Sequence, residues 1–178
     1  MEYDNNFAFD GTINEYPYHY TNKIIFTKKN INYYNDNDNT NLDFLFEKYN
    51  KIFLKMDIEG GEYPFLLNIN VDKLKLFTQI VIEFHGINDN SWNCNYEDKI
   101  KCLEKLSNTH YLIHVHGNNY GGIMNNIPNV IECTFINKNY YKGNIELNKI
   151  NLPIVNLDYP NIPNIKNYDL NFYPFVHN

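Results

Sequence analysis

The chain has 178 residues, 43% of them hydrophobic and 16% aromatic, which is enough to bury a core without disulfides or a metal. All 15 cationic residues are lysines and the formal net charge is -6, which argues against a nucleic-acid surface, where arginine is the preferred contact. No basic segment followed by an apolar run opens the chain, and no stretch of about 18 apolar residues occurs in it. We therefore expect no contact with a membrane.

The three cysteines predict a reducing environment. Cys94, Cys102 and Cys133 lack the paired spacing of a metal site, and their odd number leaves one thiol without a partner. Free cysteine is usually a small buried hydrophobe. We therefore expect a cytoplasmic protein with reduced cysteines.

Apolar runs separated by turn residues predict an alternation of strands and helices. The expected strands are 6–9, 23–27, 52–54, 79–84, 111–116 and 130–137, and the expected helices follow Thr40 and cover 62–67 and 96–106. The polar segment 30–39 is expected to be a loop. Four prolines after residue 152 predict an extended C-terminal tail, 152–178, without regular elements.

This alternation predicts the fold class. Continuous apolar strands are buried on both faces, as in parallel sheets that are covered by helices. We expect one α/β domain over residues 1–178, with a doubly wound, mostly parallel sheet and the proline-rich tail packed on it.

The most informative segment is 55–62, Lys-Met-Asp-Ile-Glu-Gly-Gly-Glu, where an apolar strand ends in carboxylates and glycines. Ligands of open α/β sheets lie outside the carboxyl ends of the strands, so Asp57 and Glu59 are expected to point towards a pocket. Asp57 could instead be the N-cap of the next helix. Glu59 and Glu62 could simply complement the dipole of that helix.

Two later strands also end in ionisable side chains. Glu83 and His85 share one strand face, and His114 and His116 share another, because side chains alternate along a strand. Each unpaired polar group in a core costs roughly 1–3 kcal/mol, so these groups must be paired, solvated or bound to a ligand. His85 is either a general base or a hydrogen-bonded histidine, and the two later imidazoles could bind a metal or a substrate hydroxyl.

A polar loop follows the last of these strands. Asn118 and Asn119 precede a pair of glycines at 121–122, which suits a tight loop at the mouth of a pocket. We expect both asparagines to contact substrate.

Segment 55–62 resembles the signature of the FkbM-type methyltransferases. Segment 82–85 resembles the family's following strand, and 114–119, 129–135 and 152–163 resemble a subgroup with a HxHGNN motif. The resemblance implies a Rossmann-like class I methyltransferase fold and transfer of a methyl group from S-adenosyl-L-methionine (SAM) to a hydroxyl of a small acceptor such as a sugar.

The start of the chain resembles the family less completely. Segment 9–12 is similar to the end of the family's second strand, which implies that Asp10 approaches the ribose hydroxyls of SAM; a plain turn aspartate before glycine is the alternative. The family's glycine-rich turn should precede Asp10 by about twenty residues. Only nine residues precede it, and no GxGxG-like segment occurs in the chain. The resemblance therefore implies a chain that lacks the first strand and its cofactor loop, with weak or no SAM affinity.

The first functional hypothesis is an O-methyltransferase-like domain without a metal. Its expected residues fall into a catalytic, a cofactor-binding and an acceptor-binding group: Asp57, Glu83, His85 and His114 for catalysis; Asp10 and Asp57 for the cofactor; Glu59, His116, Asn118 and Asn119 for the acceptor. The second hypothesis is a catalytically inactive remnant that serves as a binding module. The third is a metal-dependent hydrolase that uses Asp57, Glu83, His114 and His116.

Overall fold

The computed structural model describes residues 5–18 and 23–177, and the chain divides into two compact units between Lys48 and Tyr49. In the first unit, strand β1 (Asn6–Phe9) pairs in parallel with β2 (Ile24–Thr27). The two-residue strands β3 (Asn30–Ile31) and β4 (Asn39–Thr40) lie within and beside the segment that was predicted to be a loop, and helix α1 (Asp43–Lys48) follows them. Phe44 of α1 packs edge-on against two rings of β1.

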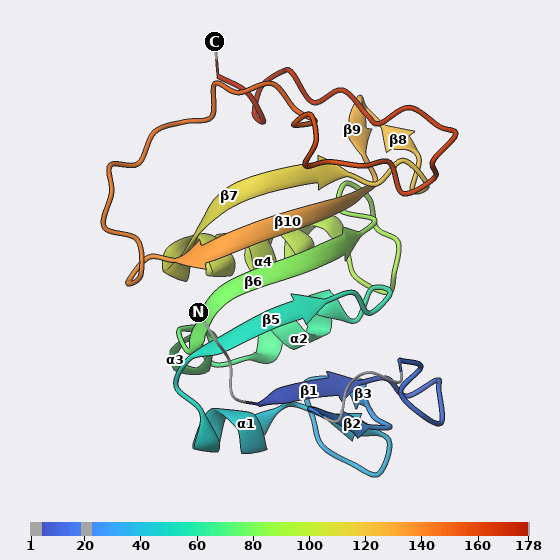
Figure 1. The fold of residues 1–178 in the computed structure, drawn as a ribbon, viewed down its shortest axis with the longest axis vertical. Helices are drawn as coiled ribbons and strands as arrows, with labels where there is room; N and C mark the ends of the chain where they lie inside the picture. Colours follow the sequence, from blue (N-terminus) through green and yellow to red (C-terminus); the bar gives the residue numbers. More distant parts are fainter. Residues whose placement is uncertain (1–4, 19–22, 178) are drawn as a thin grey trace. The chain divides into compact units, whose positions relative to one another are not determined.

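The second unit is built on a four-stranded sheet (Figure 1). Its strand order is β5 (Ile52–Met56), β6 (Phe77–His85), β10 (Val130–Asn137) and β7 (His110–Gly117). Strands β5 and β6 are parallel, whereas β10 runs antiparallel to both of its neighbours. The molecule is therefore of the mixed α/β class, and the predicted strands are confirmed.

Strands β5, β6 and β7 run in the same direction, and β10 runs against them, so the sheet is mixed. The connection from β7 to β10 contains only the short strands β8 (Ile123–Met124) and β9 (Ile127–Pro128) and no helix. Parallel neighbours need a long crossover, usually through a helix, so a strand that returns after so short a connection pairs antiparallel.

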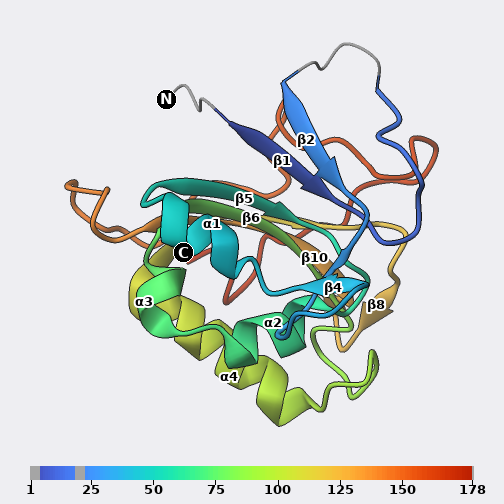
Figure 2. The same cartoon turned by 90° about the horizontal axis from the view of Figure 1, so that it is seen from below.

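The helices of this unit are α2 (Glu62–Asn68), α3 (Val71–Leu74) and α4 (Tyr96–Thr109), and they lie together on one face of the sheet (Figure 2). The doubly wound arrangement is therefore not confirmed for the described residues. The covered face holds the core: alternate strand residues that point towards the helices are almost completely buried, including Met56, Ile80, Ile82, Phe84, Cys133 and Phe135. Tyr63, Phe65 and Leu106 fill the helix side of the same core.

The opposite face of the sheet is polar. Register places Glu83 of β6 beside Glu132 of β10, and Glu132 beside His116 of β7. Residues 152–177 contain no helix or strand, as the prolines predicted, and this C-terminal tail supplies side chains that bond to the polar face of β7 and β10. Among the described residues, no helix is both long enough and apolar enough to span a bilayer.

Candidate functional site

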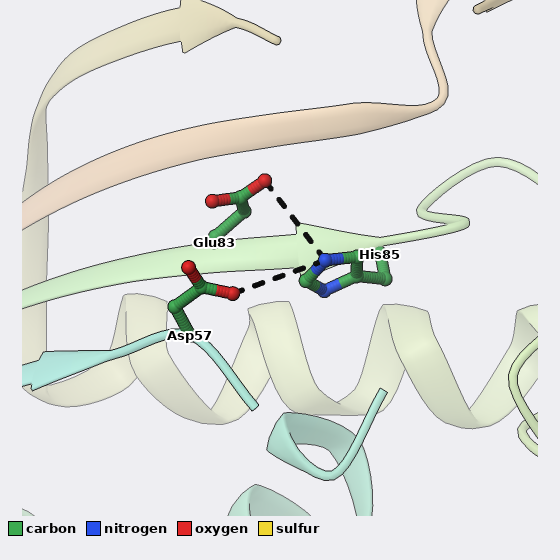
Figure 3. A group of neighbouring side chains, drawn as sticks. All are labelled: Asp57, Glu83 and His85. Atoms are coloured by element: carbon green, nitrogen blue, oxygen red, sulfur yellow. Dashed lines mark ion pairs between the residues drawn. The ribbon is translucent and has the colours of Figure 1, made fainter. Parts of the chain in front are cut away.

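Three ionisable side chains from two neighbouring strand ends meet at one place (Figure 3). Met56 of β5 pairs with Ile82 of β6, so the position that follows each of them brings Asp57 beside Glu83. His85 ends β6 two residues later. One ligand atom from each of these three side chains lies within 4.8 Å of the other two. The parallel pairing of β5 and β6 creates this group, since parallel strands end at the same edge of a sheet.

The imidazole of His85 lies at the centre of the group, with 6% of its side chain exposed. Its Nε2 atom faces three carboxylates: Asp57 Oδ1 at 3.9 Å, Glu83 Oε1 at 3.9 Å and Glu59 Oε2 at 3.3 Å. Its Nδ1 atom faces the opposite way and lies 3.2 Å from Glu62 Oε1. The two ring nitrogens therefore have different neighbours, which separates their chemical roles.

The backbone of segment 55–62 explains how the carboxylates of Asp57 and Glu59 both reach the ring of His85. Glu59 adopts a left-handed conformation, φ 53°, and Gly60 follows with φ 90°. A Cβ atom on Gly60 would lie 2.8 Å from the Cβ atom of Trp92, so only glycine fits there. The chain therefore turns sharply after Asp57, and Glu59 folds back towards His85.

Trp92 forms one wall of the site. Its ring lies 4.9 Å from the ring of His85, centroid to centroid. The tryptophan is partly exposed and packs against Gly60, so it joins the loop after β6 to the turn after β5. Aromatic rings in such positions exclude water and offer a flat apolar surface to a ligand.

The surroundings raise the pKa values of both His85 and Glu83. Burial alone would lower the pKa of His85, but the hydrogen bond to Glu62 and the charges of the surrounding carboxylates outweigh it and raise the pKa above the ordinary 6.5. Burial raises the pKa of Glu83, and the nearby negative charges add to this, against the lowering effect of a hydrogen bond from Asn118. Both groups hold a proton more tightly than free side chains do.

The distances alone would allow Asp57, Glu83 and His85 to hold a metal ion. The third hypothesis, a metal-dependent hydrolase, needs His114 and His116 in the same donor set. The structure gives those two imidazoles other partners.

His114 and His116 bind the C-terminal tail. His114 Nε2 lies 2.7 Å from Asp158 Oδ1, and His116 Nε2 lies 3.2 Å from Asn167 Oδ1. His116 Nδ1 lies 2.9 Å from Glu132 Oε2, and this hydrogen bond is the main cause of a raised pKa at His116. The structure therefore brings Glu83 and His85 together as predicted, whereas these two imidazoles form a separate network with the tail.

The two asparagines after β7 have different surroundings. Asn118 donates to Glu83 Oε1 at 2.7 Å and so belongs to the edge of the site. Asn119 is buried, and its side chain donates to the carbonyls of Ile162 and Ile165 and accepts from the amide of Ile162. Its polar atoms are engaged by the tail.

Asp10 lies in the first unit, directly after β1. Its Oδ1 atom accepts hydrogen bonds from the amide and the hydroxyl of Thr12, at 2.7 and 2.6 Å. Those bonds lower the pKa of Asp10. This is the geometry of the turn aspartate that was the alternative to ribose binding.

The sequence reasoning missed two residues of the site. Glu62 was interpreted as a partner of the helix dipole, but its carboxylate turns inward to His85. Trp92 lies in a segment to which no role was given, although a lone tryptophan seven residues after a strand-end histidine was the available signal.

Comparison with known proteins agrees with the motif at 55–62. A family model described as the methyltransferase FkbM domain matches residues 7–120, which is more than half of the chain and includes every predicted site residue. No curated protein and no solved structure matches the chain significantly. The family consists of methyltransferases that generally depend on SAM. With its signature segment placed beside a strand-end histidine, and with the match extending from β1 to the loop after β7, the chain belongs to the FkbM methyltransferase family.

Proposed function

We propose that this chain is an O-methyltransferase that methylates a hydroxyl of a small acceptor such as a sugar, and that its sheet is part of a Rossmann-like class I architecture. The observation that carries the proposal is the convergence of Asp57, Glu83 and His85 in a chain of the FkbM family. A hydroxyl is a poor nucleophile until it is oriented and loses its proton, and these three side chains supply both functions.

His85 is the proposed proton acceptor. Its Nε2 atom faces the group, and the raised pKa makes it a stronger base than free imidazole once it is deprotonated. Asp57 and Glu83 orient the acceptor by accepting hydrogen bonds from its neighbouring hydroxyls, while the reacting hydroxyl donates to His85. Asn118 fixes the carboxylate of Glu83. Glu59, 73% exposed, reaches the same ring from the solvent side and extends the acceptor surface.

The remaining predicted residues lie in the tail network. His114 is proposed as a secondary proton acceptor, since its bond to Asp158 also fixes one ring nitrogen. A role for His116 and Asn119 in acceptor binding requires their hydrogen bonds to the tail to break first.

The residues proposed to bind the methyl acceptor fit this function better than the residues proposed to bind SAM, the methyl donor. SAM, when bound, supplies the methyl group from a sulfonium cation, and the excess of carboxylates around His85 favours a cationic ligand. Asp57 is the proposed cofactor contact in the second unit. In the first unit, Asp10, which the family resemblance implies as a ribose contact, has its Oδ1 atom engaged by Thr12. We expect weak SAM binding, and micromolar affinity in calorimetry would contradict this expectation.

A second candidate is a binding module without catalysis, which is favoured by the engagement of Asp10 with Thr12. Methyl transfer from labelled SAM to a panel of sugars, at millimolar SAM, separates the two functions. We expect transfer, and we expect His85→Asn to reduce kcat by about 10²-fold or more, as loss of a general base does, with a smaller loss in His114→Asn. His177→Asn, in the tail, is the matched control. Full activity in the His85 and His114 double variant would remove the assignment, and no transfer by the native protein would support the binding module.

A further inference from the structure

A buried carboxylate lies behind the proposed base. Glu62 is 0% exposed, and its Oε1 atom accepts hydrogen bonds from the backbone amide of His85 at 2.8 Å and from Nδ1 at 3.2 Å. Its Oε2 atom accepts from the amide of Gly60 at 2.9 Å. Among the described residues, its one ion pair is with His85. A carboxylate that is removed from water needs such partners, because an unpaired buried charge is strongly destabilising.

Glu62 and Tyr63 together fix the backbone of His85 as well as its ring. Glu62 holds the backbone amide of His85, while the hydroxyl of Tyr63 donates to the carbonyl of His85 at 2.7 Å. Both anchors come from the first turn of α2, so one rigid element sets the position of the backbone and of the ring.

The arrangement also sets the tautomer. Both oxygens of Glu62 already accept hydrogen bonds from backbone amides, so Glu62 also faces Nδ1 as an acceptor, and the hydrogen of that contact is on Nδ1. In the neutral imidazole, Nε2 is then the nitrogen with a free lone pair. That atom faces Asp57, Glu59 and Glu83, where the acceptor hydroxyl is proposed to lie.

We propose that Glu62 is a positioning residue that keeps His85 in the Nδ1-protonated form, so that Nε2 is available to take the acceptor proton. The proposal rests on the function proposed above for its catalytic meaning, but the tautomer itself follows from geometry. Among the described residues, the four ionisable groups that face the ring are carboxylates: Asp57 and Glu59 from the turn after β5, Glu62 from α2 and Glu83 from β6. The hydrogen bond to Glu62 contributes to the raised pKa of His85.

The native protein provides the first test. Long-range 1H–15N spectra of the histidine rings, with the His85 signals identified by their loss in His85→Asn, report which nitrogen carries the hydrogen above the titration midpoint. We expect the Nδ1-protonated tautomer. The Nε2-protonated tautomer would overturn the proposal without the need for any variant at Glu62.

Glu62→Gln provides the second test, because glutamine keeps the size of the side chain and removes its charge. We expect the midpoint of the His85 titration to fall by about one pH unit or more, as loss of an opposite charge at this distance does. The matched control is Glu132→Gln, which removes the equivalent partner of His116 and should lower the midpoint of His116 but leave that of His85 in place. An unchanged His85 midpoint in a folded Glu62→Gln variant would overturn the proposal.

Kinetics connect this test to function. In Glu62→Gln we expect kcat to fall with little change in KM, and the pH dependence of kcat to move to lower pH together with the His85 midpoint. A fall in kcat with an unmoved pH profile would show a merely structural role. Absence of methyl transfer in the native protein would remove the proposed function and leave the tautomer and titration results standing.

Discussion

Replacing Lys99 by methionine should destabilise the second unit by about 3 kcal/mol. Lys99 of α4 is 0% exposed, and its Nζ atom donates to the carbonyls of Gly86 at 2.6 Å and Ser91 at 2.9 Å. It also lies 3.5 Å from Asp89 Oδ1 and 5.0 Å from the centroid of the Tyr63 ring. The ammonium thus ties together the loop that follows β6, which carries one wall of the site.

The magnitude follows from what methionine leaves behind. The aliphatic stem is kept, but two hydrogen bonds from a charged donor are lost, each worth about 1.5–3 kcal/mol. The two carbonyls keep only longer bonds from backbone amides, Gly86 from Asp89 and Ser91 from Cys94, both at 3.3 Å. Asp89 keeps its bonds from Ser91 and Asn129, so it adds little. Removal of a buried ammonium recovers part of its desolvation cost, which brings the net loss to about 3 kcal/mol. Such a loss is a large fraction of the 5–15 kcal/mol that typically stabilises a domain.

Urea unfolding followed by far-UV circular dichroism measures this loss, and the fluorescence of Trp92, the one tryptophan of the chain, reports on the loop. Lys101→Met is the control, since it makes the same change on the same helix. Lys101 is 61% exposed and, among the described residues, bonds only to Asp98 at 2.6 Å, a surface pair that contributes little to stability. If both variants lost the same stability, the account of Lys99 as a buried anchor would be refuted.

Two further predictions concern the tail and the turn after β5. His116 has a raised pKa in the folded state, so its contribution to stability is fully present below pH 6.5 and is lost as the pH rises through the folded value; Glu132 has a lowered pKa, so its contribution is present above pH 4.5 and is lost in acid. The protection factors of the amides in residues 152–177, which are corrected for the base-catalysed intrinsic rate, should therefore fall at high pH, and in the His116→Gln variant they should lack this dependence. Gly60→Ala should cost about 1–3 kcal/mol in thermal unfolding, because φ is 90° and the new methyl group would press on Trp92; an unchanged free energy of unfolding would contradict the strained turn.

Much of the fold could be predicted from local pattern, since every expected strand exists. The errors lie at boundaries and at short elements. Strand β6 begins at Phe77, two residues before the predicted start, and the four-residue helix α3, capped by Asn70, was missed. Short elements carry few periodic residues, so hydrophobic spacing cannot identify them.

The site could be predicted where neighbouring strands determine it. Alternation placed Glu83 and His85 on one face, and the parallel neighbour β5 added Asp57. The role of Glu62 could not be found in the same way, because its carboxylate binds an amide 23 residues away and satisfies no helix N–H of its own. Contacts between residues so far apart depend on how α2 packs, which the local pattern does not contain.

The antiparallel strand β10 explains why Glu83 and His85 of β6 lie apart from the two histidines near the end of β7, His114 and His116. The first hypothesis grouped His114 with Glu83 and His85 for catalysis, which requires β6 and β7 to lie close together. In the structure β10 lies between them, and strands are about 4.8 Å apart, so β7 is displaced by roughly 10 Å from β6. Strand β10 also places Glu132 between Glu83 and His116, where the carboxylate of Glu132 forms a hydrogen bond with Nδ1 of His116. The position of this antiparallel strand, which the local sequence pattern does not contain, therefore accounts for the imidazoles that bind the tail.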